Sequence, residues 1–380
     1  MASTQCFLCK IRHLVSRVSV GRYSDIKKSV FLSQSKDIFT NLALEDWLYK
    51  NFDFKNHHIL ILWQSDPCVV IGRHQNPWLE ANLPELPHIT KNGVKLARRN
   101  SGGGTVYHDH GNLNLTFFTT KERYSRKYNL EVIARALFRK YNATVEISPR
   151  EDLMIRNYKI SGSASRLGRP NAYHHCTLLV NSNKQDLSLA LQKQNIEVNT
   201  KASRSVISKI MNLCEEVPDI DITSLIEAIG WEYLRTPALT ITDGGMELAN
   251  QQKGFQMTNP TESLFPGLDN IREDFMSWNW LYGRTPDFVV TKSFEVPTHL
   301  TNGKRQNMLV TMTVEKGNIA GVKLKLIPEE PCDKVKVATT LIGHRFSIQA
   351  LSKLSDLLNL AENGRDRFVT ECLEQVVSSF

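Results

Sequence analysis

Short apolar runs rich in β-branched residues are the feature that most limits what this chain can fold into. The runs HILILW at 58–63 and CVVIG at 68–72 are separated by QSDP. Runs of this length bounded by turn residues are typical of buried strands, and the Asp-Pro turn predicts that the two form a hairpin. Similar runs predict further strands at 94–99, 105–108, 113–118, 144–148, 152–156, 158–161 and 175–180.

Helical periodicity interrupts these strands. Over 130–141 the apolar positions follow the i, i+3, i+4 spacing of an amphipathic helix. Shorter helices are expected at 41–49, with Thr40 as its cap, and at 185–192 and 224–234. This order of elements predicts the α+β class, with a large domain of mixed or antiparallel sheets flanked by helices.

The 380 residues are enough for two domains. A polar stretch at 251–264 contains Gly and Pro and is predicted to be a linker. It would join a catalytic domain at 31–250 to a smaller C-terminal α+β domain at 265–380. In the smaller domain we expect strands at 308–313 and 319–326 and a helix at 365–380.

Positive charge is concentrated at the N-terminus. Residues 1–30 hold six basic residues and one acid, and so carry five of the eight net positive charges of the chain. An acid-poor amphipathic start of this kind predicts a mitochondrial transit peptide and a location in the matrix, although an ordinary basic surface helix has the same pattern. The rest of the chain is close to neutral, which argues against nucleic-acid binding. No apolar run reaches the roughly 18 residues that a bilayer span needs.

The segment ARRNSGGGTVYHD at 97–109 carries the first candidate site. Three successive glycines at 102–104 each cost about 0.5–1 kcal/mol relative to alanine in a regular element, so a need for bare backbone would explain them. Such backbone can approach an anion closely, and Arg98 and Arg99 directly before the loop could pair with its charge. A tight turn beside a solvated basic face explains the pattern equally well. The spacing matches neither a P-loop nor a dinucleotide fingerprint.

Lys159 is the second candidate, because it is flanked by Tyr158 and Ile160 in a strand-like stretch and the small residues SGSAS follow. An ammonium group there could hold a phosphate and a developing oxyanion. A surface lysine on an edge strand is the alternative. The neighbouring His174 and His175 should point to opposite faces of their strand, so we expect structural histidines and no metal site.

Taken together, these segments resemble the lipoate-protein ligase A and lipoyltransferase family, which has the biotinyl/lipoyl protein ligase fold. The resemblance rests on IGRHQNPWLE (71–80), ARRNSGGGTVYHD (97–109), EDL (151–153), KISGSA (159–164) and HHCTLL (174–179), and continues through 203–213 and 277–283. With the basic N-terminus, it favours the mitochondrial lipoyltransferase branch.

The resemblance implies transfer of a lipoyl group from lipoyl-AMP, or from a lipoylated donor protein, to a lysine of an acceptor protein. The acceptors implied are the lipoyl domains of 2-oxoacid dehydrogenase acyltransferase subunits and the glycine-cleavage H-protein. Lys159 would be the catalytic lysine at the acyl-phosphate bridge. The residues implied to contact lipoyl-AMP are Arg98, Ser101, Gly102, Gly103, Gly104, Thr105, Val106, Tyr107, Arg150, Thr177, Ser203 and Ser205.

Lipoyl-AMP is then a substrate, and we expect no permanently bound cofactor, no nucleic-acid or membrane partner, and a monomer. Departures from the bacterial ligase pattern at Glu151, Tyr158, Cys176 and Ile207 favour acyl transfer over activation of lipoate by ATP. A full ATP-dependent ligase, which would require Mg²⁺, stays open as the alternative. A biotin or octanoyl transferase of the same fold is a further possibility, since one sequence does not reveal pocket length.

Two details of the chemistry follow as expectations. Two groups are candidates for the base that accepts the proton of the attacking lysine, namely Asp109 and the departing phosphate. An apolar channel for the acyl tail is expected around Leu60, Val70 and Ile71.

Overall fold

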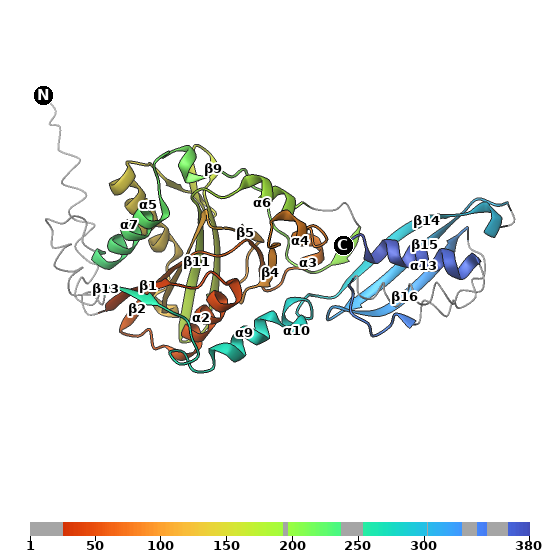
Figure 1. The fold of residues 1–380 in the computed structure, drawn as a ribbon, viewed down its shortest axis with the longest axis horizontal. Helices are drawn as coiled ribbons and strands as arrows, with labels where there is room; N and C mark the ends of the chain where they lie inside the picture. The colour runs from red at the N-terminus through yellow and green to blue at the C-terminus, as the bar shows by residue number, and fades with distance from the viewer. Residues whose placement is uncertain (1–25, 193–196, 237–253, 302, 329–339, 348–363) are drawn as a thin grey trace, which may run out of the picture.

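A six-stranded sheet forms the centre of the larger part of the molecule (Figure 1). The computed structural model describes residues 26–192, 197–236, 254–301, 303–328, 340–347 and 364–380. Strand β1 pairs in parallel with both neighbours, and the remaining pairs are antiparallel. In spatial order the strands are β10 (Ser161–Leu167), β11 (Asn171–Leu179), β6 (Asn112–Thr120), β2 (His57–Trp63), β1 (Lys27–Ser33) and β13 (Gly254–Thr258).

Helices cover both faces of this sheet. Alternate apolar residues of β2 point to opposite sides, so Leu60 and Leu62 pack with α5 (Arg126–Tyr141) and α7 (Ile222–Arg235). Ile59 and Ile61 point to the other side. There they share an apolar cluster with residues of α2 (Ile38–Asn51), α9 (Leu268–Met276) and α10 (Trp278–Leu281). The predicted α+β architecture is therefore confirmed.

Two three-stranded sheets lie beside the central sheet, one of which is mixed and carries the glycine segment. The mixed sheet has the order β4 (Lys95–Arg98), β3 (Cys68–Ile71) and β5 (Val106–His108), and the antiparallel one has β7 (Glu146–Ile147), β8 (Leu153–Ile155) and β9 (Tyr158–Lys159). Short helices accompany them: α3 (Pro77–Glu80), α4 (Leu86–Ile89) and α6 (Lys184–Ala190).

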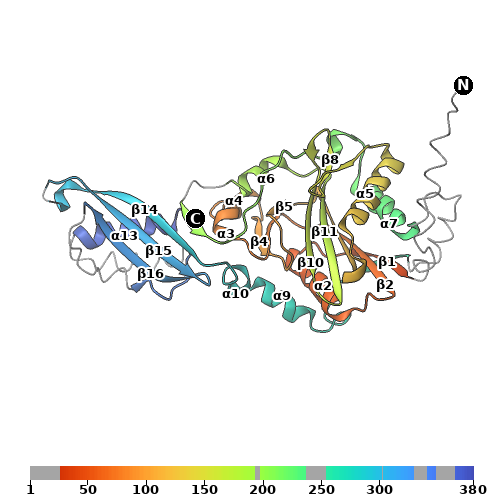
Figure 2. The ribbon, with the colours of Figure 1, turned by 180° about the vertical axis from the view of Figure 1, so that it is seen from behind.

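A separate C-terminal unit lies at one end of the molecule, reached along α9 and α10 (Figures 1 and 2). Its antiparallel sheet packs against one long helix through a common apolar cluster. The elements are β12 (Val198–Thr200), β14 (Phe288–Val296), β15 (Gln306–Glu315), β16 (Asn318–Ile327) and α13 (Gly364–Val377). Strand β12 comes from the middle of the chain, so this sheet joins distant segments.

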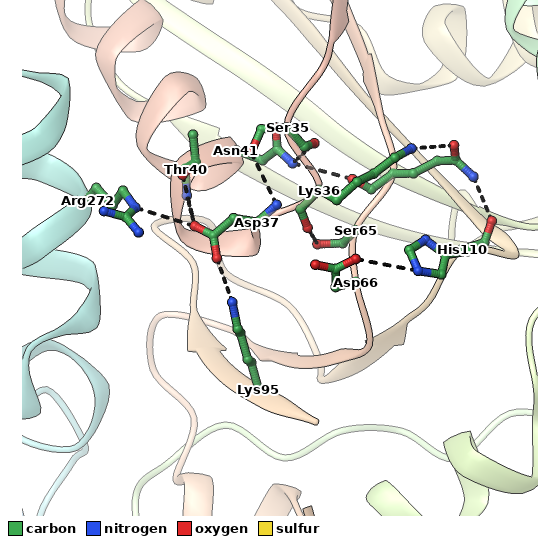
Figure 3. Close-up of polar contacts among 11 residues, drawn as sticks. Ser35, Lys36, Asp37, Thr40, Asn41, Ser65, Asp66, Lys95, His110 and Arg272 are labelled. Carbon is green, nitrogen blue, oxygen red and sulfur yellow. Dashed lines mark hydrogen bonds and ion pairs between the residues drawn. The ribbon is translucent and has the colours of Figure 1, made fainter. Parts of the chain in front are cut away.

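Asp37 fixes the corner at which β1 leads into α2 (Figure 3). Its side chain accepts the Thr40 N–H at 2.9 Å and so caps the helix. The same carboxylate pairs with Lys95 Nζ at 2.8 Å and Arg272 Nε at 3.5 Å, so it ties β4 and α9 to the corner. The predicted helix is present, but Asp37 caps it and the expected cap Thr40 lies inside it.

The predicted hairpin at 58–72 is wrong, although both of its strands are buried as expected. Strand β2 pairs with β1 and β6 in the central sheet, whereas β3 pairs with β4 and β5 in the small one. The Asp-Pro segment therefore carries the chain from one sheet to another. Local turn signals do not reveal which strands will pair across long sequence distances.

Two predicted boundaries fall inside strands. Within the stretch 251–264, expected to be a linker, residues Gly254–Thr258 form β13 at the edge of the central sheet. The expected transit peptide at 1–30 lies outside the described residues up to position 25, but its last residues belong to β1, where Val30 is completely buried. Among the described residues, no helix has the length and apolar character needed to cross a membrane.

Candidate functional site

The glycine segment between β4 and β5 lies against β10, and this contact brings the two sequence-predicted motifs together. A Cβ atom built on Gly103 would lie 3.3 Å from the Ser163 carbonyl oxygen and 3.6 Å from the Ala164 Cβ. Gly103 has φ +88°, a conformation that favours glycine. The positive φ and the close contact with β10 together account for glycine at this position.

The side chain of Arg99 fixes the backbone conformation of the glycine segment. Its buried guanidinium donates to the carbonyl oxygens of Gly102 and Gly104, each at 2.7 Å, and to that of Val70 at 3.0 Å. Nε donates to Ser101 Oγ at 3.0 Å, so Ser101 is part of this support. Burial lowers the pKa of Arg99 to about 10, which leaves it protonated at neutral pH. The glycine carbonyls face this charge, and so the loop is fixed before any ligand arrives.

The segment around Ser205 closes over the other side of the loop. Ser205 Oγ accepts the Thr105 N–H at 2.8 Å and a hydrogen bond from Gln75 Nε2 at 3.0 Å. The Thr105 hydroxyl lies 2.9 Å from Gln75 Oε1 and 3.3 Å from Glu80 Oε2. The polar groups of Thr105 and Ser205 named here bind protein partners, so they join two loops as well as bordering the site.

Lys159 lies on β9, directly before the strand that faces the glycine segment. Its ammonium pairs with Asp152 Oδ1 at 2.8 Å, and about a quarter of its side chain is exposed. Its backbone is held by N–H donation to the Lys209 carbonyl at 2.9 Å and by acceptance from Met211 N–H at 3.1 Å. The lysine is therefore fixed in position and accessible, and one carboxylate orients it.

Residues from three strands pack closely at Gly162, three positions after Lys159. A Cβ on Gly162 would meet Thr177 Oγ1 at 3.0 Å and Val106 Cγ1 at 3.3 Å. The Gly162 N–H donates to Thr177 Oγ1 at 3.0 Å. Val106, Gly162 and Thr177 are thus in mutual contact next to the glycine segment.

Arg98 does not point toward this surface, although the resemblance implied that it contacts the adenylate. Its side chain is completely buried, and its guanidinium donates to the carbonyl oxygens of Leu281 at 2.7 Å, Gln75 at 2.8 Å and Arg73 at 3.0 Å. It also donates to Thr285 Oγ1 at 2.8 Å. Because its donors are used in this way, Arg98 anchors the segment after α10 and is not placed for a nucleotide contact.

Tyr107 is also turned away, because successive residues of β5 point to opposite faces. Its ring is buried in a cluster with Val69 and Ile71, whereas Val106 faces Gly162. A side-chain contact between Tyr107 and an adenylate is therefore inconsistent with this geometry.

The remaining predicted contacts lie at the edges. Ser203 and Arg150 are exposed, the former with its N–H bonded to the His74 carbonyl at 3.0 Å and the latter in the turn between β7 and β8. Asp109, one of the two groups considered as the base, is buried, and backbone N–H groups hold both of its carboxylate oxygens. Its Oδ1 accepts the Gly111 N–H and its Oδ2 accepts the Asn183 N–H, both at 2.8 Å.

A buried polar cluster on the α2 side of the sheet was not predicted. Glu45 Oε2 lies 2.8 Å from His175 Nδ1 and accepts the Thr116 hydroxyl at 2.8 Å. Burial is the largest single influence and by itself raises the pKa of Glu45, but His175 together with hydrogen bonds from Thr116 and Tyr173 outweighs it, so the net pKa is lowered. The ring of His108 stacks near His175, and burial and the charge of His175 hold the pKa of His108 well below its usual value. A glutamate within the apolar run NLALEDWLY was the sequence signal for this cluster.

The predicted apolar channel does not form as expected. Leu60 packs on the α5 and α7 side, Val70 on the α2 side, and Ile71 in the cluster that contains Tyr107. The three side chains thus belong to different clusters.

As expected, His174 and His175 point apart: His174 Nε2 lies 3.1 Å from Ser163 Oγ, while His175 pairs with Glu45. Within the described part of the chain, no group of three or more His, Cys, Asp or Glu side chains could hold a metal ion.

Comparison with known proteins shows which proteins this chain is similar to. Residues 37–233 match the lipoyl protein ligase A/B catalytic domain. The chain is 37% identical to the mitochondrial lipoyl amidotransferase of Homo sapiens over 90% of this chain and 88% of the relative, and 39% identical to that of Mus musculus over 94% and 92%. It is 35% identical to lipoate-protein ligase A of Bdellovibrio bacteriovorus over 73% of this chain and 77% of the relative.

Solved structures agree on the fold. A lipoate complex of LipL1 from P. falciparum superposes with a TM-score of 0.57 and 24% identity, covering 92% of this chain and 99% of that one. A lipoate-protein ligase A with bound ATP gives a TM-score of 0.50 and 22% identity, covering 66% and 95%.

Proposed function

The chain belongs to the lipoyl protein ligase A/B family, whose members include lipoyl-transferring enzymes, and from this we propose that it transfers a lipoyl group to lysines of lipoyl domains. The proposed donor is lipoyl-AMP or a lipoylated protein. The observation that carries the proposal is the contact of the glycine segment, whose backbone is exposed at Gly103, with β10, the strand that directly follows Lys159 and its fixed ammonium.

The reaction needs little chemistry from the protein, because the carbonyl of a mixed anhydride is already activated. The acceptor amine attacks the carbonyl carbon and forms the amide bond, while the carbon–oxygen bond to the phosphate breaks and AMP leaves with the electron pair. The ammonium of Lys159 would stabilise the negative charge that develops on the carbonyl and phosphate oxygens. With Asp109 occupied, the departing phosphate is the proposed acceptor of the amine proton.

Asp152 is proposed to orient Lys159 in this role. A charge-assisted hydrogen bond of 2.8 Å to Asp152 keeps the ammonium in one position. This bond uses one of the three N–H donors and leaves the others for the substrate. The proposed contacts of lipoyl-AMP are then the glycine segment, Val106 and Thr177. The central-sheet unit would carry the reaction and the C-terminal unit would be accessory.

A transfer assay tests the proposal. Purified protein is incubated with an apo lipoyl domain and lipoyl-AMP, and the mass of the acceptor lysine is followed by mass spectrometry. Lys159→Ala should remove transfer while the protein stays folded, whereas Lys91→Ala, at an exposed lysine with no assigned part in the site, should leave the rate unchanged. Full turnover by Lys159→Ala would refute the assigned role.

The second candidate is a full lipoate-protein ligase, favoured by the similarity to the bacterial ligase. Supplying lipoate, ATP and Mg²⁺ in place of lipoyl-AMP separates the two activities. Equal rates from both mixtures would refute a function limited to transfer. Apo H-protein and a lipoylated donor protein complete the set of substrates.

We also propose that the protein acts in the mitochondrial matrix. The human and mouse relatives are named as mitochondrial, and residues 1–30 are strongly basic. Import of the full chain into isolated mitochondria, followed by protease treatment and mass spectrometry of the N-terminus, measures both location and cleavage. Because β1 begins at Lys27, a cut after residue 30 should not be found.

A further inference from the structure

A buried carboxylate stands where the glycine segment meets the segment around Ser205. Glu80 is the last residue of α3, and only 2% of it is exposed. Its Oε1 accepts the Ser205 N–H at 3.1 Å, and its Oε2 lies 3.3 Å from the Thr105 hydroxyl. One side chain thus holds residues that are 100 positions apart in the sequence.

Helix α3 is itself rigidly placed, which makes Glu80 a fixed point. Asn76 caps the helix by accepting the Trp78 N–H at 3.0 Å. Trp78 is buried in the apolar cluster of the C-terminal unit, against the rings of Tyr282, Phe288 and Phe346. Figure 1 shows α3 on the side of the larger unit that faces the sheet of the C-terminal unit.

The segment that Glu80 holds is exposed on both sides of Ser205. Ser203 and Arg204 are exposed, and so are the apolar side chains Val206 and Ile207, of which 65% and 87% are accessible. Among the described contacts, the backbone of this segment is held by the bond from Ser203 N–H to His74 and by the bond from Ser205 N–H to Glu80. The Ser205 side chain is also tied to the loop, because its Oγ accepts the Thr105 N–H at 2.8 Å and a hydrogen bond from Gln75 Nε2 at 3.0 Å. Loss of the carboxylate would remove the bond to the Ser205 backbone and leave only these two side-chain bonds, so the segment should open more often.

We propose that Glu80 is a positioning residue that pins the Ser205 segment to the glycine loop and so preforms the acyl-adenylate site. The consequence for the reaction rests on the proposed lipoyl transfer, whereas the pinning itself does not. Glu80 acts through Ser205 and Thr105 and is not placed on the reacting atoms.

Proteolysis measures the pin without any substrate. The bond after Arg204 is a trypsin site, and its cleavage in the native protein reports how often this segment opens. A hydrogen bond to a carboxylate changes such an equilibrium about tenfold or more. Glu80→Ala should therefore be cut after Arg204 at least about tenfold faster than the wild type.

Two variants serve as controls. Glu80→Gln keeps an acceptor oxygen for the Ser205 N–H and can donate to the Thr105 hydroxyl, so its cleavage should return to within about threefold of the wild type. Glu85→Ala removes an exposed acid a few residues further along and should be cut at the wild-type rate.

Transfer kinetics give the functional readout. Glu80→Ala should raise KM for lipoyl-AMP about tenfold with a smaller change in kcat, because the pinned segment organises binding, and Glu80→Gln should restore KM. If the wild type transfers lipoyl but Glu80→Ala shows unchanged cleavage and KM, the pin is refuted. If the wild type transfers nothing while the cleavage pattern is as expected, the proposed function fails and the pin stands.

Hydrogen exchange covers the case in which Glu80→Ala does not fold. In the wild-type protein, the Ser205 amide should exchange at least about tenfold more slowly than the same amide in an unstructured peptide. Exchange at the free-peptide rate would overturn the proposal without any variant.

Discussion

Replacement of Arg98 by methionine tests whether this arginine is structural. Methionine fills a similar volume but removes all donors from a side chain that is completely buried. The carbonyl oxygens of Arg73, Gln75 and Leu281 would then lose a charged donor. Each buried acceptor left without a partner costs about 1–3 kcal/mol.

The expected loss in the free energy of unfolding is therefore at least about 3 kcal/mol. Arg73→Met provides the control, because this neighbouring arginine is partly exposed and its guanidinium bond to Asn100 Oδ1 measures 3.1 Å. Its loss should cost less than about 1 kcal/mol.

Urea unfolding measures both values, and the tryptophans of α10 provide the signal. The indole N–H of Trp280 donates to the Arg98 carbonyl at 2.7 Å, so its fluorescence reports directly on this contact. The lower free energy of unfolding of Arg98→Met should appear in the urea transition followed by Trp280 fluorescence. If Arg98→Met costs less than about 1 kcal/mol, and instead weakens binding of lipoyl-AMP more than tenfold in a folded protein, then Arg98 contacts the nucleotide and the structural interpretation is wrong.

Two further predictions concern the backbone of the glycine segment and the buried histidines. A Cβ on Gly72 would lie 2.2 Å from the Gly103 carbonyl oxygen and one on Gly103 would need φ +88°, whereas a Cβ on Gly102 meets nothing within 4 Å. Thermal unfolding and lipoyl-AMP binding should therefore be impaired most by Gly72→Ala, less by Gly103→Ala and hardly by Gly102→Ala; equal effects at all three positions would contradict the close-approach argument. Burial holds the pKa of His108 and of His174 well below 6.5 in the folded protein, so below pH 6.5 the unfolded chain binds protons that the folded one does not. Urea unfolding should show a stability about 3 kcal/mol lower at pH 5.5 than at pH 7.5 from these two groups, and His88→Gln, at an exposed position, should leave the difference unchanged. A stability that does not fall over this range would show that the two histidines are accessible to protons.

Local patterns in the sequence predicted many of the elements and the two motifs. The periodicity at 130–141 predicts α5, and short apolar runs predict β2, β6 and β11 of the central sheet, because side-chain spacing is set by backbone geometry alone. Strands β1 and β13 fall instead in stretches predicted to be a transit peptide and a linker. The glycine segment and Lys159 can also be recognised from the sequence alone. Their residue types are unfavourable for packing, and this shows from the sequence without knowledge of their neighbours.

Only the tertiary structure decided what the polar residues bind. Arg98 and Arg99 are adjacent in the sequence, yet one anchors the segment after α10 and the other shapes the glycine loop. Glu80 and Ser205 meet because separate loops close on each other, and β2 and β3 enter different sheets despite a four-residue connection. A hydrogen bond or a strand pairing depends on which distant groups are buried together. That information lies in the packing of the whole chain and not in any local spacing.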